Sequence, residues 1–258
     1  MSDDNKKIIC LAGMGRSGTS LMASYLQHCG IPMGDKMLAA GKWNRKGFYE
    51  DIEFLEFHKN LLKINKSNLY LPRKSRTVPE PERQTAIQIL ERRSESHSIW
   101  GWKDPRTSLF MDLWLDLDKD IKFIFMYRSP YEVIESIFRI MKGYNLYLRP
   151  WIAVKGWIYY NRELLKLQKQ YPERCAFVSI HGFDSKPEQA SASLAAWLDY
   201  DLSKPYSDVY EPTERRAGSK PFPINLWMPL AKKFYGDELS HLYKAVDEVA
   251  IVKSNHEI

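Results

Sequence analysis

Cysteine is scarce in this sequence of 258 residues, and the three cysteines that occur are far apart. They stand at Cys10, Cys29 and Cys175, an odd number without paired spacing. Such a pattern does not suit a disulfide framework or a thiolate metal site and is typical of buried thiols in a reducing compartment. The six histidines also lack the spacing of metal ligands. We therefore expect no metal site and a cytoplasmic location.

Long apolar runs are missing as well. No run reaches the roughly 18 residues of a transmembrane helix, and the polar start MSDDNKK is unlike a secretory signal. Internal repeats and low-complexity tracts are absent. The net charge of +6 suits an anionic ligand. Because the basic residues are spread out and no nucleic-acid motif occurs, we expect neither nucleic acid nor a membrane as a partner.

The most informative stretch covers residues 8–29 and reads IICLAGMGRSGTSLMASYLQHC. Its apolar start, 8–12, is typical of a buried strand, and an amphipathic helical pattern runs over 19–29. Between them, GMGRSGTS supplies three glycines and three hydroxyl groups. A strand, a glycine-rich loop and a helix N-terminus in this order present converging N–H groups and a partial positive charge. This combination predicts a phosphate-binding loop.

The loop departs at one position from the triphosphate-binding pattern G-x-x-x-x-G-K-[ST]. Gly13, Gly18 and Ser20 fit that pattern, but Thr19 occupies the lysine position. Arg16 instead supplies a cation two residues before the second glycine. Because the missing lysine reaches the β- and γ-phosphates in ATP and GTP enzymes, the sequence favours a nucleotide with a shorter 5′ anionic tail. The alternative is a strand–helix turn that binds no ligand.

Short apolar runs alternate with helical patterns along the rest of the chain. Further strands are expected at 98–103, 121–127 and 176–180. Further helices are expected from residue 51, over 81–94, 107–115 and 131–140, within 141–171, after 180, and as one or two helices over 227–252. The irregular stretch 63–80 is interpreted as an exposed loop or a lid. The alternation predicts an α/β fold, a P-loop-like three-layer sandwich with a mostly parallel central sheet flanked by helices on both faces, in a single domain over 1–258.

The loop sequence GMGRSGTSLM resembles the 5′-phosphosulfate loop of sulfotransferases that use 3′-phosphoadenosine 5′-phosphosulfate (PAPS). It has the Arg-Ser-Gly-Thr form of tyrosylprotein and bacterial members, and the resemblance extends over about residues 8–200. It implies in-line transfer of a sulfuryl group from PAPS to a hydroxyl or amine, with 3′,5′-adenosine bisphosphate as product and no metal. The residues that it implies around the 5′ end of the donor are Gly15, Arg16, Ser17, Gly18, Thr19 and Ser20.

A second family signature, Arg-x-Pro-x-x-x-x-x-Ser, is matched without a gap by Arg128, Pro130 and Ser136. Arg128 directly follows the expected strand 121–127, and Ser136 lies about two helical turns further on, so the two can converge on one phosphate. The resemblance implies that this is the 3′-phosphate of the donor. Arg216, in a late basic stretch that contains glycine, is a further candidate for binding it.

Lys103 ends the expected strand 98–103 within the block WKDPRT. This block resembles the Lys-Asp-Pro segment of the family, in which the lysine contacts the phosphosulfate and the leaving oxygen. With Arg16, Lys103 would offset charge that develops during transfer. The alternative for Lys103 is an exposed strand end, and Asp104 equally suits a helix cap.

Two acidic residues, Glu50 and Asp51, stand at the start of the helix expected from residue 51. They suit either N-terminal capping or a general base. The resemblance favours Glu50 as the base, with Asp51 as the second candidate. His58, deeper in the same helix, is interpreted as a surface or packing residue.

Two other functions remain open on the sequence. One is a P-loop small-molecule kinase, which Thr19 and the lack of an acidic residue after Tyr127 disfavour. The other is a non-catalytic nucleotide-binding module. We expect a small-molecule acceptor and a monomer or homodimer.

Overall fold

A four-stranded sheet forms the centre of the protein. The structure, a computed structural model, describes residues 6–38, 49–70, 72–140, 151–210 and 222–254. The strands are β1 (Lys7–Gly13), β2 (Ile99–Lys103), β3 (Ile121–Tyr127) and β4 (Cys175–Ser179). Their order is β2-β1-β3-β4, and every neighbouring pair is parallel. The chain therefore crosses between parallel strands through helices, as the alternating sequence pattern predicts.

Successive residues of the strands point to opposite faces of the sheet and bury two separate cores. On β1, Ile8 and Cys10 belong to one core, whereas Ile9 and Leu11 belong to the other. Both cores need apolar side chains, which explains why β1 and β3 read as continuous apolar runs and not as alternating ones.

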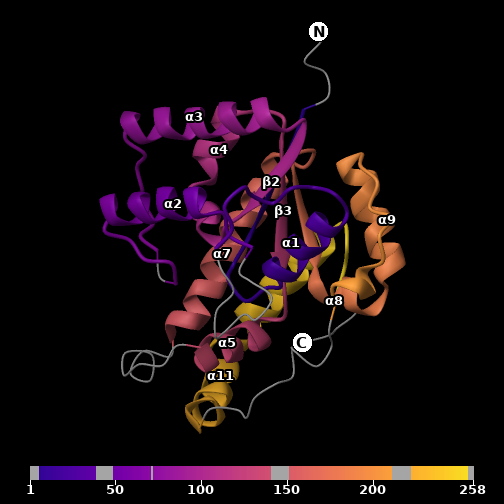
Figure 1. The fold of residues 1–258 in the computed structure, drawn as a ribbon. Helices are drawn as coiled ribbons and strands as arrows, with labels where there is room; N and C mark the ends of the chain where they lie inside the picture. Colours follow the sequence, from indigo (N-terminus) through magenta and orange to yellow (C-terminus); the bar gives the residue numbers. More distant parts are fainter. Residues whose placement is uncertain (1–5, 39–48, 71, 141–150, 211–221, 255–258) are drawn as a thin grey trace.

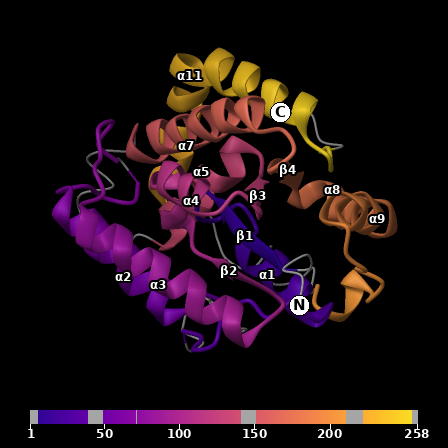
Figure 2. The same cartoon turned by 90° about the horizontal axis from the view of Figure 1, so that it is seen from above.

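Helices cover both faces (Figures 1 and 2). The first core lies under α2 (Ile52–Ile64), α3 (Glu80–Ser96), α4 (Met111–Leu117), α5 (Pro130–Ile140), α7 (Trp151–Gln170) and α11 (Phe222–Val249). The second lies under α1 (Thr19–His28), α8 (Ile180–Ser185) and α9 (Pro187–Leu198). Two short 3₁₀ helices, η1 (Pro105–Leu109) and η2 (Tyr206–Asp208), complete the elements of the described residues. The predicted three-layer α/β sandwich is confirmed.

Some element boundaries differ from the prediction. The helix expected over 107–115 is divided into η1 and α4, because the backbone of Phe110 leaves the helical region. The N–H of Phe110 donates to the carbonyl oxygen of Thr107, which is the bond of a 3₁₀ turn. The last strand begins at Cys175 and ends at Ser179, where the Ser179 hydroxyl caps α8 by accepting from the Gly182 N–H. The C-terminal region forms the single helix α11, which contains Pro229.

Parallel pairing brings the carboxyl ends of all four strands to one edge of the sheet, where ligand sites of open α/β sheets lie. At this edge, Gly13 of β1 pairs with Met126 of β3. Gly13 has a φ of 123°, and a Cβ atom there would lie 2.5 Å from the carbonyl oxygen of Met126. Only glycine permits both this backbone conformation and this approach of the two strands.

Replacing Gly13 by alanine tests this requirement. The methyl group would overlap the Met126 carbonyl, so we expect Gly13→Ala to lower the free energy of unfolding by at least about 2 kcal/mol. Gly15→Ala is the matched control, since no atom lies within 4 Å of a Cβ at Gly15 and its φ is not positive. Urea denaturation of the two variants measures the difference. Equal losses would show that the approach of β1 to β3 does not require glycine.

Candidate active site

The loop at residues 13–20, here called the anion loop, connects β1 to α1 through three residues with positive φ. These are Gly13 at 123°, Arg16 at 78° and Gly18 at 93°. A left-handed backbone is uncommon for arginine. A left-handed residue beside a right-handed one can turn neighbouring N–H groups toward a common point, as in anion-binding loops. In this loop the N–H groups of Gly13 and Ser17 already have acceptors, the Ser108 hydroxyl and the Met14 carbonyl.

The start of α1 is also suited to an anion. Gly18 is its N-cap residue, no side chain accepts a hydrogen bond at this cap, and the first turn holds no acidic residue. The first N–H groups of a helix have no partner within the helix, so those of α1 can bond an external acceptor. Of the predicted loop residues, Ser17 and Thr19 are buried, whereas Gly15, Arg16 and Ser20 are partly exposed.

Three guanidinium groups, here called the arginine cluster, gather beside the anion loop: those of Arg16, Arg128 and Arg139. Burial lowers the pKa of Arg16, and the charges of Arg128 and Arg139 lower it further. Its Nε donates a hydrogen bond of 2.9 Å to the Ser136 hydroxyl on α5. Residues from the loop after β1 and from the segment after β3, which the sequence places far apart, therefore meet in space.

The three arginines differ in their partners. Arg128 makes a bidentate pair with Glu132, with Nε–Oε2 and Nη2–Oε1 distances of 3.1 Å, and Arg139 pairs with Glu135. Arg16 has no carboxylate partner among the residues that the structure describes. In a half-buried setting, a guanidinium bonded only by a hydroxyl leaves most of its charge uncompensated. Arg16 is therefore the member of the cluster that is best prepared to bind an external anion.

Glu132 connects the arginine cluster to β4, because His181, which follows that strand, also bonds its carboxylate. Burial alone would raise the pKa of Glu132, but the hydrogen bonds from His181 and Arg128 hold that pKa at about 2. Arg128 and Ser136 thus have different protein partners, and their predicted convergence on one phosphate stays a prediction. Arg128 bonds Glu132, Ser136 bonds Arg16, and both lie beside Arg16.

A second group of charged side chains, here called the ion quartet, lies at the end of β2. Lys103 Nζ lies 2.8 Å from Glu50 Oε1. Arg106 Nη1 lies 3.3 Å from Glu50 Oε2 and 2.8 Å from Asp104 Oδ1. These side chains are at most 17% exposed, and that of Asp104 is fully buried. Two cations and two anions balance one another in a site that excludes most water.

Burial has opposite effects on the lysine and the aspartate of the quartet. It lowers the pKa of Lys103, an effect that Glu50 opposes. It would raise the pKa of Asp104, but the hydrogen bond from His58 and the charge of Arg106 reverse the direction, and the net pKa of Asp104 is lowered. Asp104 is therefore held as a carboxylate. Lys103 gives up a proton more readily than an exposed lysine does.

The two acidic candidates at the start of α2 have different surroundings. Asp51 is the N-cap residue of α2, where its carboxylate accepts from the Glu53 N–H at 2.8 Å and from Arg93 at 2.9 Å. The capping interpretation thus describes Asp51, while Glu50 contacts Lys103 and Arg106. His58 is not a surface residue: it is fully buried, with polar partners that the sequence did not suggest.

The anion loop and the ion quartet are neighbours. Leu11 of β1 pairs with Lys103 of β2, and the Ser108 hydroxyl of η1 accepts from the Gly13 N–H at 2.9 Å. Charges of both groups act on Tyr70: burial raises its pKa, Arg16 and Arg106 lower it, and Glu50 raises it. The sequence analysis missed Tyr70, which stands in a stretch without a pattern. It also missed Arg106, although the spacing of three residues from Lys103 was a usable signal.

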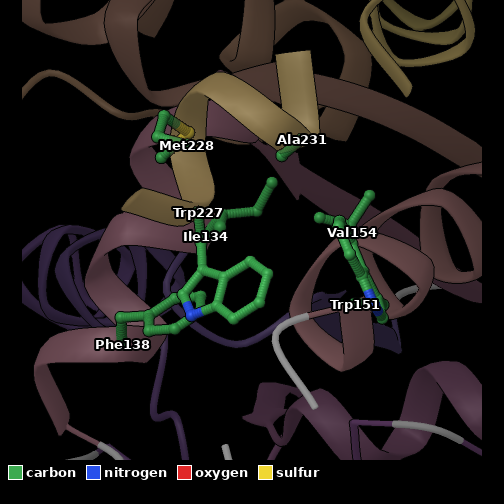
Figure 3. A pocket seen from close by; sticks show the side chains of 7 residues that line it. All are labelled: Ile134, Phe138, Trp151, Val154, Trp227, Met228 and Ala231. Carbon is green, nitrogen blue, oxygen red and sulfur yellow. The ribbon is translucent and has the colours of Figure 1, made fainter. Parts of the chain in front are cut away.

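Two hollows lie away from these groups. One, between α5, α7 and α11, has a volume of about 10 Å³, and its lining is apolar (Figure 3). It has room for a single water at most, and Ile134 and Phe138 in its wall are about 200° around α5 from Ser136. The other is a groove of about 640 Å³ along α7 and α11, bordered by Pro72 and Lys74. Neither includes a residue of the anion loop or the ion quartet.

Two further expectations concern metals and membranes. No group of three or more His, Cys, Asp or Glu side chains is placed to hold a metal ion within the described ranges. Of the helices in those ranges, none has the length and apolar character needed to cross a bilayer.

The three cysteines are buried and form no disulfide. Arg216 lies outside the described residues, so its predicted contact with the donor stays a prediction.

Comparison with known proteins gives a result for the fold. No family model and no curated protein matches this sequence. Among solved structures, the sulfotransferase from Alicyclobacillus acidocaldarius matches with a TM-score of 0.56 and 14% identity over 96% of this chain and 97% of that chain. Sulfotransferase STF9 from Mycobacterium avium matches with a TM-score of 0.54 and 12% identity, over 98% and 79% of the two chains. Sulfotransferase STF1 from Mycobacterium tuberculosis H37Rv matches at 0.51 and 11%, over 94% and 77%. The chain has the fold of these sulfotransferases.

The low pKa of Glu132 makes stability depend on pH in a defined window. A carboxylate with a depressed pKa contributes stability that is present above its ordinary value of 4.5 and is lost as the pH falls toward about 2. The side chain is 38% exposed, so solvent screening keeps this contribution below about 1 kcal/mol. Urea denaturation from pH 5 to pH 2 should therefore show a shallower decline for Glu132→Gln than for the wild type. Parallel curves would contradict the strong pairing of Glu132.

Proposed function

We propose that this protein is a PAPS-dependent sulfotransferase that transfers a sulfuryl group to a hydroxyl or amine of a small-molecule acceptor. Its fold is that of sulfotransferases. The single observation that carries the proposal is the position of Arg16: a guanidinium held by a left-handed residue of the anion loop, beside two other arginines and without a carboxylate partner among the described residues. Such a site favours a multiply charged anion.

The residues fit a donor that carries anionic groups at both its 5′ and 3′ positions. The N–H groups and hydroxyls of residues 15–20, with Arg16, would hold the 5′-phosphosulfate at the uncapped start of α1. Arg128 and Ser136 would hold the 3′-phosphate. Because Glu132 already occupies two N–H donors of Arg128, a phosphate at this position has to share or displace that carboxylate.

The donor supplies an activated sulfuryl group, and the bond from sulfur to the bridging oxygen of the phosphate breaks as sulfur bonds the acceptor. Glu50 would take the proton of the acceptor as a general base. Lys103, 2.8 Å from Glu50, would stabilise the charge that develops on the bridging oxygen, as would Arg16 on the transferred group. Basic side chains thus provide the positive charge of this reaction scheme, which includes no metal ion.

Two experiments separate this function from a kinase and from a nucleotide-binding module. Isotope transfer from ³⁵S-labelled PAPS to a panel of small hydroxyl and amine acceptors tests catalysis. A thermal shift assay compares 3′,5′-adenosine bisphosphate with ATP and Mg²⁺. We expect transfer to at least one acceptor and stabilisation by the bisphosphate alone. Stabilisation by ATP alone would favour the kinase, and stabilisation by the bisphosphate without any transfer would favour the binding module.

Arg128→Ala tests the 3′-phosphate assignment. Loss of a charge-assisted contact costs roughly 1.5–3 kcal/mol, so binding of 3′,5′-adenosine bisphosphate should weaken by about 10- to 100-fold. Binding of adenosine 5′-monophosphate, which lacks the 3′-phosphate, should change little. Arg139→Ala is the matched control, because it removes a charge from the same cluster, and it should affect both ligands alike. Equal losses for the two ligands in Arg128→Ala, measured by calorimetry, would remove the assignment.

Glu50→Gln tests the general base. The amide keeps the shape of the carboxylate but accepts no proton, so we expect the acid limb of the pH–rate profile to flatten and turnover to fall by about 100-fold. The affinity for 3′,5′-adenosine bisphosphate should stay close to that of the wild type. Asp51→Asn, the control at the neighbouring position, keeps an oxygen that can cap the helix but removes the charge that pairs with Arg93, so it should lower stability without changing the shape of the profile. A wild-type profile for Glu50→Gln would transfer the role to Asp51 or to a histidine.

A further inference from the structure

His58 lies directly behind the ion quartet, on the side of the aromatic core. It stands on α2 and is fully buried. Its Nδ1 is 2.9 Å from Asp104 Oδ2, and its Nε2 is 3.1 Å from the indole Nε1 of Trp114. Asp104 is also fully buried. An imidazole and a carboxylate that lie 46 residues apart in the sequence are thus paired in the interior.

The surroundings of His58 determine which nitrogen carries the proton. An indole N–H can only donate a hydrogen bond, so Nε2 accepts from Trp114 and Nδ1 carries the hydrogen that is donated to Asp104. Aromatic rings surround the imidazole, with centroid distances of 5.4 Å to Phe57, 5.6 Å to Trp114 and 6.3 Å to Phe110. A ring packed in this way has one orientation and one tautomer.

Asp104 connects His58 to the other members of the quartet, because both of its oxygens accept hydrogen bonds. Oδ2 accepts from His58, whereas Oδ1 accepts from the backbone N–H of Arg106 at 2.9 Å and from its Nη1 at 2.8 Å. The same Nη1 also reaches Glu50 Oε2 at 3.3 Å, and Lys103 bonds the other oxygen of Glu50. An unbroken series of hydrogen bonds therefore runs from Trp114 to the carboxylate of Glu50.

The charges explain how His58 would affect Glu50. Arg106 Nη1 is shared between two carboxylates and lies closer to Asp104. If the donor from His58 is lost, Asp104 Oδ2 is left unbonded in a fully buried position, which is costly. The smallest rearrangement that compensates is a movement of the Arg106 guanidinium toward Asp104. This movement draws Arg106 away from Glu50 and leaves one carboxylate oxygen of Glu50 without its partner.

We propose that His58 is a positioning residue for sulfuryl transfer: its Nδ1–H orients Asp104, which fixes Arg106, which together with Lys103 sets the direction of the Glu50 carboxylate. This inference rests on the proposed function, in which Glu50 accepts the proton. Core stability alone does not account for the arrangement, because buried ionic groups can often be replaced by apolar ones without loss of stability.

Three substitutions of His58 separate positioning from packing. His58→Asn retains a donor near the place of Nδ1, His58→Gln places its amide near Nε2, and His58→Leu retains neither. A misdirected base typically costs one to two orders of magnitude in rate, so we expect kcat to fall by about 10- to 100-fold in His58→Leu and His58→Gln and to recover substantially in His58→Asn. The dissociation constant of 3′,5′-adenosine bisphosphate should stay within about twofold of the wild type, since no bond from His58 reaches the anion loop.

Leu61→Ala is the matched control for general damage to the core. Leu61 is fully buried on the same helix, one turn from His58. Its side chain is apolar and therefore forms no hydrogen bond with the quartet. Activity per folded molecule, with folding followed by circular dichroism, should be retained in Leu61→Ala. Equal losses in Leu61→Ala and His58→Leu would overturn the proposal, as would equal recovery in His58→Gln and His58→Asn.

A readout that needs no catalysis distinguishes failure of this inference from failure of the proposed function. Nitrogen-15 NMR of the wild-type protein should show His58 protonated at Nδ1 and not at Nε2. The ¹³C carboxyl resonance of Glu50 should shift in His58→Leu but not in Leu61→Ala. If no acceptor is sulfated but these signals behave as expected, the proposed function fails while the coupling stands. The inference is overturned, whatever the activity, if the proton of His58 is on Nε2 or if the Glu50 resonance does not shift in His58→Leu.

Discussion

The site depends on the close, parallel approach of β1 to its two neighbours. Gly13 lies so near the Met126 carbonyl that no side chain fits between them, and on the other side Leu11 pairs with Lys103. Because parallel strands end at the same edge, the anion loop, Lys103 and Arg128 leave the sheet together. No single segment of the chain contains the site. It exists because hydrogen-bonded strands hold three connecting segments side by side.

The two charged groups at this edge are in opposite electrostatic states. The ion quartet is balanced, and its hydrogen bonds satisfy both carboxylates in a setting that excludes most water. The arginine cluster is not balanced, because Arg16 has only the Ser136 hydroxyl as a partner in the described part of the chain. The low dielectric of the protein interior strengthens the ion pairs of the quartet, and it also makes the uncompensated charge of Arg16 more unfavourable. One group therefore has a defined geometry, and the other has positive charge that is not compensated by a carboxylate of the described residues.

Much of the fold was predictable because its signals are local. The apolar runs of β1 and β3, the glycine-rich loop and the start of α1 at Thr19 follow from contiguous residues and appear as expected. The division of the helix expected over 107–115 was not predictable. It depends on the backbone of Phe110, whose ring packs beside His58 from a distant helix. Periodicity cannot reveal a packing partner that lies far away in the sequence.

For the site, the sequence by itself determined which residue types lie at the strand ends and loop: Arg16, Lys103 and Arg128 each follow or end an apolar run. The Arg128–Glu132 ion pair could also have been predicted from the sequence, since residues four apart lie side by side on a helix. Only the tertiary structure decided that Glu50 bonds Lys103 while Asp51 caps α2, because adjacent residues project in different directions and the sequence does not state which one meets β2. The pairing of His58 with Asp104 was decided in the same way. Two elements had to pack before either side chain had a partner, and burial then made that partner obligatory.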